Sequence, residues 1–251
     1  MTFTVAVAGK GGVGKTTFAA LSAMHLHEVS GEVVLAVDAD PNHNLGAKLG
    51  TEPGRTLGDL REEMVARGEE PPPGMSKQEY IDYQIRLALK EGRGFDLLTM
   101  GRQEGPGCYC YVNNLLRTFL DSLAERYKYV VVDNEAGMEH LSRRTTRSTD
   151  VLFVVCDSSK ASVEAARRIS RLADEMHLKA PRKALVSNMR PGESDAPRAE
   201  DYPEFHAVYP VRRSSLLEAR SRQTESLLDT PKTDPAYADV RAAVDAERLR
   251  R

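Results

Sequence analysis

A glycine-rich stretch near the N-terminus decides the fold: residues 9–17 read GKGGVGKTT. This stretch matches the pattern G-x-x-x-x-G-K-[ST]. It lies between Thr4–Ala8, an apolar run typical of a β-strand, and a helical pattern from Lys15 to Val29. Its glycines allow backbone N–H groups to turn around phosphate oxygens, and the helix dipole points at the same anion. The sequence therefore predicts a phosphate-binding loop. A glycine-rich turn in an unrelated α/β protein is the alternative that the full motif disfavours.

Two side chains of the loop carry specific chemistry. Lys15 places a positive charge at the β- and γ-phosphates, and the Thr16 hydroxyl can ligate Mg²⁺. We therefore expect ATP and Mg²⁺ as cofactors. The residues expected to line the phosphates are Gly11, Gly12, Val13, Gly14, Lys15, Thr16 and Thr17.

Apolar β-branched runs alternate with helical patterns along most of the chain, which predicts an α/β fold with a mostly parallel sheet and helices on both faces. Runs such as Val130–Val132 lack polar alternation, as expected for strands that are covered on both sides. The expected strands are Thr4–Ala8, Val33–Asp38, Asp96–Met100, Tyr129–Asp133, Val151–Cys156, Ala184–Asn188 and Ala207–Tyr209. The expected helices are Lys15–Val29, Leu57–Ala66, Lys77–Lys90, Val112–Glu125, Ser162–Glu175, Ser215–Gln223 and Pro235–Arg250.

The whole chain, residues 1–251, is expected to form one P-loop domain. A charged helical excursion over residues 51–94 is interrupted by Pro71–Gly74, and we expect it to be an insertion in the same domain. The polar, Pro-rich segment Pro191–Pro203 is typical of an exposed loop. A C-terminal helix is expected over residues 235–250.

Composition excludes several classes of protein. Lys and Arg number 35 and Asp and Glu 37, so the net charge of -2 does not favour nucleic-acid binding. No apolar run approaches the roughly 18 residues of a membrane span. Residues 1–5 resemble a strand rather than a secretory signal, so we expect a cytoplasmic protein. With only 3 cysteines, a disulfide scaffold is excluded.

Three carboxylates come at or directly after the ends of apolar strands, where open parallel sheets present ligand-binding groups. Asp38 and Asp40 belong to the segment VDADPN, residues 37–42. Asp133 ends the strand YVVVD, a Walker B pattern that predicts an anchor for Mg²⁺. The alternative for Asp40 is a helix N-cap.

Lys10, at the start of the loop, gives the sequence KGGVGKTT over residues 10–17. This resembles the deviant phosphate loop of the family that includes Mrp, MinD and ParA ATPases, the nitrogenase iron protein and accessory ATPases of metalloenzyme assembly. The resemblance implies that Lys10 reaches the nucleotide of a partner subunit, so that ATP is held between the two halves of a homodimer. A solvated surface lysine is the alternative.

The resemblance also implies roles for residues outside the loop. Asp40 would orient or deprotonate the attacking water, which makes it catalytic together with Lys10 and Lys15, while Asp38 would hold the water shell of Mg²⁺. Gly137 resembles the switch glycine at the γ-phosphate. The residues implied to border the adenine are Asn188, Pro210, Val211 and Arg212. An ordinary turn residue at the end of a strand is the alternative for Asn188.

Cys108 and Cys110 lie one residue apart in the Gly-rich stretch GPGCYC, residues 105–110. A disulfide between them would close a small strained ring, so metal ligation is the better interpretation. Tetrahedral Zn²⁺ and square-planar Ni²⁺ both need four ligands. A two-fold homodimer would supply four thiolates. Two inert or merely reactive thiols are the alternative, and Cys156 is expected in the core.

Other segments match the same family as the cysteine pair. They are Asn113 and residues 115–117, the stretch 133–140 with Glu135, Glu139 and His140, and the sequence DADPN at residues 38–42. Together these resemble the carbon monoxide dehydrogenase accessory ATPases of CooC type over about residues 1–217. The resemblance implies a maturation ATPase that assists nickel insertion into the Ni-Fe-S cluster of apo carbon monoxide dehydrogenase or a related acetyl-CoA synthase. His43 and His140 could reach the metal, although surface hydrogen bonding is the simpler expectation.

Two other functions use the same kind of fold. An ATP-dependent reductase resembling the nitrogenase iron protein would need a cluster-ligating cysteine after Asp133, and residues 133–146 contain none. A MinD- or ParA-like positioning ATPase would bind a membrane or DNA. Residues 236–251 hold few large aliphatic side chains, which makes them a poor membrane anchor.

Overall fold

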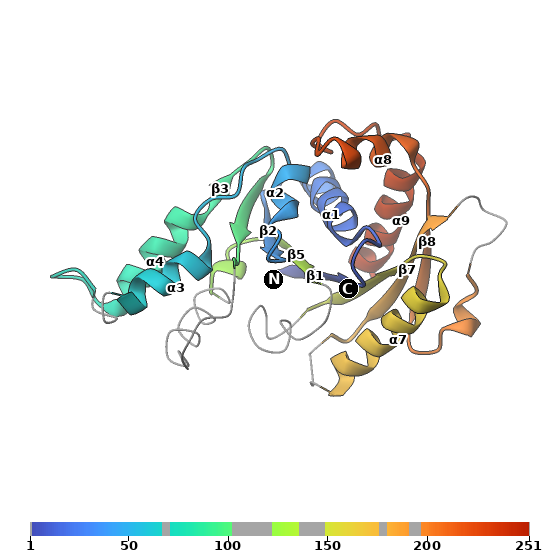
Figure 1. The fold of residues 1–251 in the computed structure, drawn as a ribbon, viewed down its shortest axis with the longest axis horizontal. Coiled ribbons are helices and arrows are strands. Elements are labelled where there is room, and N and C mark those ends of the chain that lie inside the picture. The colour runs from blue at the N-terminus through green and yellow to red at the C-terminus, as the bar shows by residue number, and fades with distance from the viewer. Residues whose placement is uncertain are drawn as a thin grey trace.

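The computed structural model describes residues 2–66, 71–101, 122–135, 149–175, 180–190 and 197–250. Strands and helices alternate as the sequence predicts (Figure 1). The strands are β1 (Phe3–Gly9), β2 (Val34–Ala39), β3 (Lys90–Glu91), β4 (Phe95–Thr99), β5 (Tyr129–Asn134), β6 (Val151–Cys156), β7 (Lys183–Arg190) and β8 (Ala207–Arg212). The helices are α1 (Lys15–Ser30), α2 (Asn44–Lys48), α3 (Leu57–Ala66), α4 (Lys77–Ala88), α7 (Lys160–Glu175), α8 (Ser215–Arg222) and α9 (Pro235–Leu249), with a short 3₁₀ helix at Ala199–Asp201.

The strands form one eight-stranded sheet in the order β3-β4-β2-β5-β1-β6-β7-β8. All neighbouring strands are parallel except β3 and β4. The order reverses around β1, so β1 lies between β5 and β6, and its carboxyl end opens at the position where such sheets bind ligands. The predicted single α/β domain with a mostly parallel sheet is confirmed.

Helices cover both faces of the sheet because successive side chains of a strand point to opposite sides. In β1, Val5 and Val7 belong to the apolar cluster that α1 and α9 complete. Ala6 and Ala8 belong to the cluster on the other face, beneath α7. Figure 1 shows α1, α8 and α9 on one side of the sheet and α7 on the other. This two-sided burial accounts for the uniformly apolar strand sequences.

The excursion over residues 51–94 contains α3 and α4, which pack on β2, β4 and β5. A capping box starts α4: the Ser76 side chain accepts from the Glu79 backbone, and Glu79 accepts from the Ser76 backbone. The excursion ends in β3, an antiparallel edge strand of two residues that the sequence did not predict. No helix in the described ranges is long and apolar enough to span a membrane.

The remaining differences from the predictions lie at boundaries and short elements. The five-residue α2 was not predicted, and α7 begins at Lys160 rather than Ser162. Strand β8 continues past Tyr209 to Arg212 and so includes Pro210. A proline is tolerated there because β8 is an edge strand, where a missing backbone N–H need not break a ladder of hydrogen bonds. Of the predicted helix Val112–Glu125, residues 122–124 are helical and the part before them lies outside the described residues.

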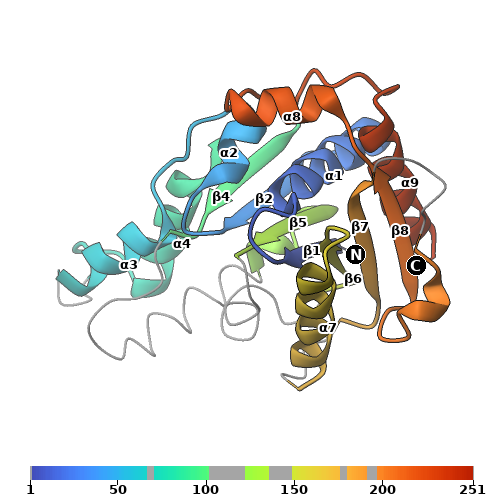
Figure 2. The ribbon, with the colours of Figure 1, turned by 45° about the vertical axis from the view of Figure 1, so that its right-hand side comes forward.

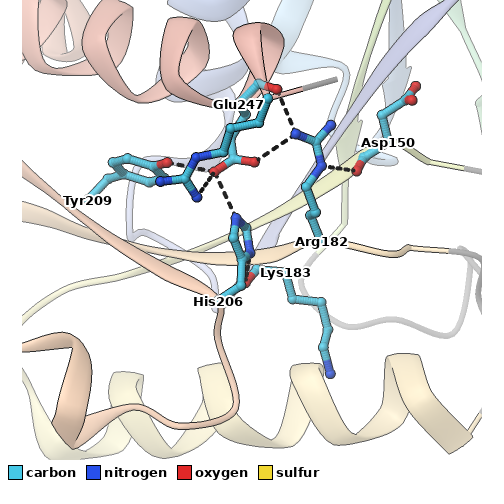
Figure 3. Close-up of polar contacts among 7 residues, drawn as sticks. Asp150, Arg182, Lys183, His206, Tyr209 and Glu247 are labelled. Carbon is cyan, nitrogen blue, oxygen red and sulfur yellow. Dashed lines mark hydrogen bonds and ion pairs between the residues drawn. The ribbon is translucent and has the colours of Figure 1, made fainter.

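Two contacts fix the C-terminal third of the chain. The Lys48 ammonium group of α2 donates to the Ser221 hydroxyl of α8 at 3.1 Å, and Figure 2 shows these helices side by side. At the opposite end of the strands, Glu247 of α9 is fully buried. Its carboxylate accepts hydrogen bonds from His206 at 2.8 Å and Tyr209 at 2.5 Å (Figure 3). Arg182 also joins this cluster with an ion pair to Glu247 at 3.2 Å, and the more exposed Arg250 pairs with Glu247 at 3.8 Å.

Candidate nucleotide-binding site

The phosphate loop joins β1 to α1 at the carboxyl edge of the sheet. Gly12 and Gly14 have φ values of 82° and 94°, a backbone region that favours glycine. A Cβ on Gly14 would also lie 2.4 Å from the side-chain nitrogen of Asn188. The loop therefore requires a glycine at position 14 for both conformation and space.

Lys15, the first residue of α1, is buried with 6% of its surface exposed. Its ammonium group donates to the Lys10 carbonyl oxygen at 3.2 Å, so it lies back over the loop. The Lys10 side chain is exposed. A hydrogen bond with Ser159 is the main cause that lowers the pKa of Asp157, and the positive charge of Lys10 lowers this pKa a little further. The loop thus has one lysine folded inside and one facing outward.

Three carboxylates, those of Asp38, Asp40 and Asp133, come at or directly after the carboxyl ends of β2 and β5. Asp38 and Asp133 are direct neighbours across these two parallel strands. The Asp38 carboxylate is buried and accepts from the backbone N–H groups of Asp40 at 3.2 Å and Leu45 at 2.9 Å. Burial raises the pKa of Asp38 to about 6, against the lowering effect of these two hydrogen bonds. Asp38 and Asp133, each expected at the end of a strand, therefore lie side by side in the sheet.

Asp133 lacks the partners that Asp38 has. It is fully buried, and neither carboxylate oxygen forms a hydrogen bond with the described residues. Burial raises its pKa to about 7, while the Thr16 hydroxyl and the Lys15 charge lower it. An unpartnered buried carboxylate beside a threonine hydroxyl fits a hydrated Mg²⁺ ion, which prefers few protein oxygens and several waters. The residues present therefore suit the expected metal.

Asp40 is held by its neighbour Asn42. Its carboxylate oxygen Oδ1 accepts from the Asn42 backbone at 2.9 Å and from the Asn42 amide at 2.8 Å. The N-cap of the following helix α2 is His43, so Asp40 is not the cap of that helix. Sequence reasoning missed Asn42, although an Asp followed two residues later by Asn is the signal of such a turn.

Asn188 lies on β7, beside the loop. Its side-chain nitrogen Nδ2 donates to the Val13 carbonyl oxygen at 2.7 Å. Asn188, which the resemblance places at the adenine, therefore contacts the phosphate loop directly.

Residues 210–212 all belong to β8, but their side chains differ in environment. Pro210 is exposed, whereas Val211 is 2% exposed and packs in the core beneath α1 and α9. The Arg212 guanidinium forms a two-point contact with Asp239 of α9, including an ion pair at 2.8 Å. The partner Asp239, 27 residues away, was not predicted.

Four of the predicted site residues fall in segments that the structure does not describe. Cys108, Cys110, Gly137 and His140 lie outside the described residues. Within the part that the structure describes, no group of three or more His, Cys, Asp or Glu could hold a metal ion. Cys156 is buried in the cluster beneath α7, as expected for a core residue.

Known proteins resemble this chain in sequence and in fold. The family model described as AAA domain matches residues 2–185. An uncharacterized ATP-binding protein of Methanocaldococcus jannaschii is 48% identical over 186 residues, which are 73% of each protein. The carbon monoxide dehydrogenase accessory protein CooC of Rhodospirillum rubrum is 32% identical over 186 residues, 70% of each.

Among solved structures, the cell division ATPase MinD of Pyrococcus furiosus has a TM-score of 0.69 at 22% identity, over 99% of this chain and 100% of that one. At this identity the likeness concerns the fold, with a P-loop at the end of the first strand. The match over residues 2–185 covers well over half of the chain. The chain therefore belongs to the AAA domain family and has the P-loop fold of MinD.

Proposed function

We propose that the chain binds ATP with Mg²⁺ and hydrolyses it to ADP and phosphate. The observation that carries this proposal is the pairing of a complete phosphate loop with Asp133, a buried carboxylate that has no hydrogen-bond partner among the described residues. An ATP-binding protein at 48% identity supports it. The phosphates would lie against the N–H groups of residues 11–17, with the adenine near Asn188 and residues 210–212.

The residues of the site have separate tasks in this reaction. Lys15 leaves the Lys10 carbonyl and places its charge on the β- and γ-phosphates. Asp40, held by Asn42, orients a water molecule and takes its proton as the water oxygen attacks the γ-phosphorus. The bond from that phosphorus to the bridging oxygen breaks, and ADP leaves. When bound, Mg²⁺ neutralises negative charge on the phosphate oxygens, held through Thr16, Asp133 and Asp38.

We further propose that the working unit is a homodimer. The Lys10 side chain is exposed, so its charge is available to a nucleotide held by a second subunit. The two subunits would then contribute the same surface to a two-fold interface. Dimerisation and ATP binding would be linked, because each favours the same arrangement.

The specific task proposed for this ATPase is to assist nickel insertion into carbon monoxide dehydrogenase or a related nickel enzyme. Support comes from the Cys108 and Cys110 pair in the sequence and from the 32% identity to the accessory protein CooC. In the dimer, two such pairs would supply four thiolates for Ni²⁺ or Zn²⁺. ATP hydrolysis would change the pairing of the subunits and thereby release the metal.

A positioning function like that of MinD is the second candidate, because the fold is shared. In some proteins a C-terminal amphipathic helix binds membranes through its apolar face. Here the corresponding side chains of α9, Val240 and Val244, are buried against the body of the domain. This packing favours the metal-delivery proposal over a membrane anchor.

Metal titration with mass measurement tests the nickel proposal. Wild type is expected to bind one Ni²⁺ or Zn²⁺ per dimer, and Cys108→Ser/Cys110→Ser is expected to lose that site. Cys156→Ala is the matched control, since it removes a thiol that is buried in the core. A double variant that still binds one metal ion per dimer with unchanged affinity would contradict the assignment.

A further inference from the structure

A side chain from β7 holds the phosphate loop from outside. Asn188 Nδ2 donates to the Val13 carbonyl oxygen at 2.7 Å, between residues 175 positions apart in the sequence. A carbonyl oxygen only accepts hydrogen bonds, so the nitrogen end of the amide must face it. The contact therefore fixes the orientation of the Asn188 carboxamide.

The direction of this hydrogen bond bears on phosphate binding. The described chain contains no cis peptide bond. In a trans peptide, the carbonyl of one residue and the N–H of the next point in opposite directions. Because the Val13 carbonyl points at Asn188, the Gly14 N–H points away from β7. Loops of this kind bind anions with N–H groups that converge on the side away from their carbonyls.

The loop and Asn188 are also packed against each other. A Cβ on Gly14 would lie 2.4 Å from Asn188 Nδ2 and 3.8 Å from the Met189 methyl group. The φ of Gly14 is +94°. The Asn188 side chain therefore lies directly against the Val13–Gly14 peptide.

Asn188 lies within an irregular part of β7. Met189 has a φ of 59°, which is unfavourable for a residue with a side chain. It lies where the pairing of β7 with β8 changes register, between Ser187 and Arg190. Such bulges reorient side chains next to functional sites, and strained residues persist there when their surroundings hold them.

From these contacts we infer that Asn188 is a positioning residue for the phosphate loop, which keeps the Gly14 N–H directed at the triphosphate whether or not a base is present. The inference rests on the proposed ATP binding and extends it. The same amide has a second N–H and a carbonyl oxygen, the groups that an adenine edge requires. One side chain would therefore link base recognition to the shape of the loop.

Binding of a ligand without a base separates the two tasks of Asn188. We expect Asn188→Ala to weaken Mg-tripolyphosphate binding by about tenfold, as the loss of one buried hydrogen bond implies, and to weaken Mg-ATP binding by at least as much, because ATP also loses a contact to its base. Gln223→Ala, which removes an exposed carboxamide, is the matched control and should bind both ligands like wild type. Weakened ATP binding with unchanged tripolyphosphate binding would restrict Asn188 to the base and overturn the inference.

Hydrogen exchange in the ligand-free protein gives a second readout. Asn188→Ala and Asn188→Ser, whose hydroxyl is too short to replace the amide, should both show faster amide exchange in residues 10–16 than wild type. Unchanged exchange in a folded variant would also overturn the inference. Failure of wild type to bind ATP would instead contradict the proposed function, since the exchange measurement needs no nucleotide.

Discussion

At Asp133, burial and charge oppose one another. The carboxyl is fully buried, without a hydrogen-bond partner among the described residues, and burial raises its pKa to about 7. In the unfolded chain the pKa is near the ordinary value of 3.8. Between these two pH values the folded protein holds a proton that the unfolded chain has released. The free energy of unfolding of the metal-free protein therefore falls as the pH rises from about 4 to about 7.

Replacing this carboxylate by an amide removes the conflict. We expect Asp133→Asn in EDTA at pH 8 to be more stable than wild type by about 1–3 kcal/mol, the cost of an unsatisfied buried group. The difference should shrink at pH 5, where the wild-type carboxyl is protonated. Thermal unfolding at both pH values measures it, and each kcal/mol corresponds to about 2–4 °C in a domain of this size.

The control for this comparison is Asp229→Asn, whose side chain is 80% exposed in wild type. Mg-ATP should raise the melting temperature of wild type and of this control much more than that of Asp133→Asn. An Asp133→Asn protein that is less stable than wild type at pH 8 without metal would show that the carboxylate is satisfied in the fold.

At the scale of elements, Glu247 fixes α9 to the β7–β8 edge of the sheet. Its buried carboxylate forms an ion pair with Arg182 and accepts hydrogen bonds from His206 and Tyr209 (Figure 3). We expect Glu247→Ala to lower the free energy of unfolding by about 3 kcal/mol, because Arg182 loses its counter-charge in a largely buried position. Urea unfolding measures this loss.

A double-mutant cycle with Arg182→Ala tests the cause of that destabilisation. The double variant should lose less stability than the sum of the two single variants, since no unpaired charge is left behind. Strictly additive losses would contradict the account of this cluster.

Elements with a local sequence signal were predictable, and elements set by distant contacts were not. The phosphate loop and α1 follow from a glycine pattern and a helix start within residues 9–17. The two residues of β3 are too few for any periodicity, and their pairing with β4 depends on the whole excursion. Strand β8 continues past Pro210 because it is an edge strand, which only the strand order reveals.

The site follows the same division. Asp38 and Asp133 were predictable because parallel strands present their carboxyl ends along one edge. The contact between Asn188 and Val13 joins residues 175 positions apart, and it lies beside a register shift of β7 at Met189. No local pattern encodes such a shift, since it is a compromise between neighbouring strands.

At the scale of the molecule, the sheet separates stability from chemistry. The residues of the nucleotide site lie at the carboxyl ends of β1, β2 and β5. Arg182 and His206 directly precede β7 and β8, so the Glu247 cluster lies at the opposite edge. In this arrangement the carboxyl edge is left to bind the nucleotide, while the other edge holds the C-terminal helix in place.

The most direct test of the central claim is ATP hydrolysis by wild type and Asp40→Ala with saturating Mg²⁺, measured with the mass of the ATP-bound species. We predict phosphate release by wild type and by the exposed control Asp229→Ala. Asp40→Ala should release at least about a hundredfold less, because it lacks the group that takes the proton from water, yet it should still form ATP-dependent dimers. Wild-type rates in Asp40→Ala, or a wild-type protein that neither binds nor hydrolyses ATP, would contradict the account.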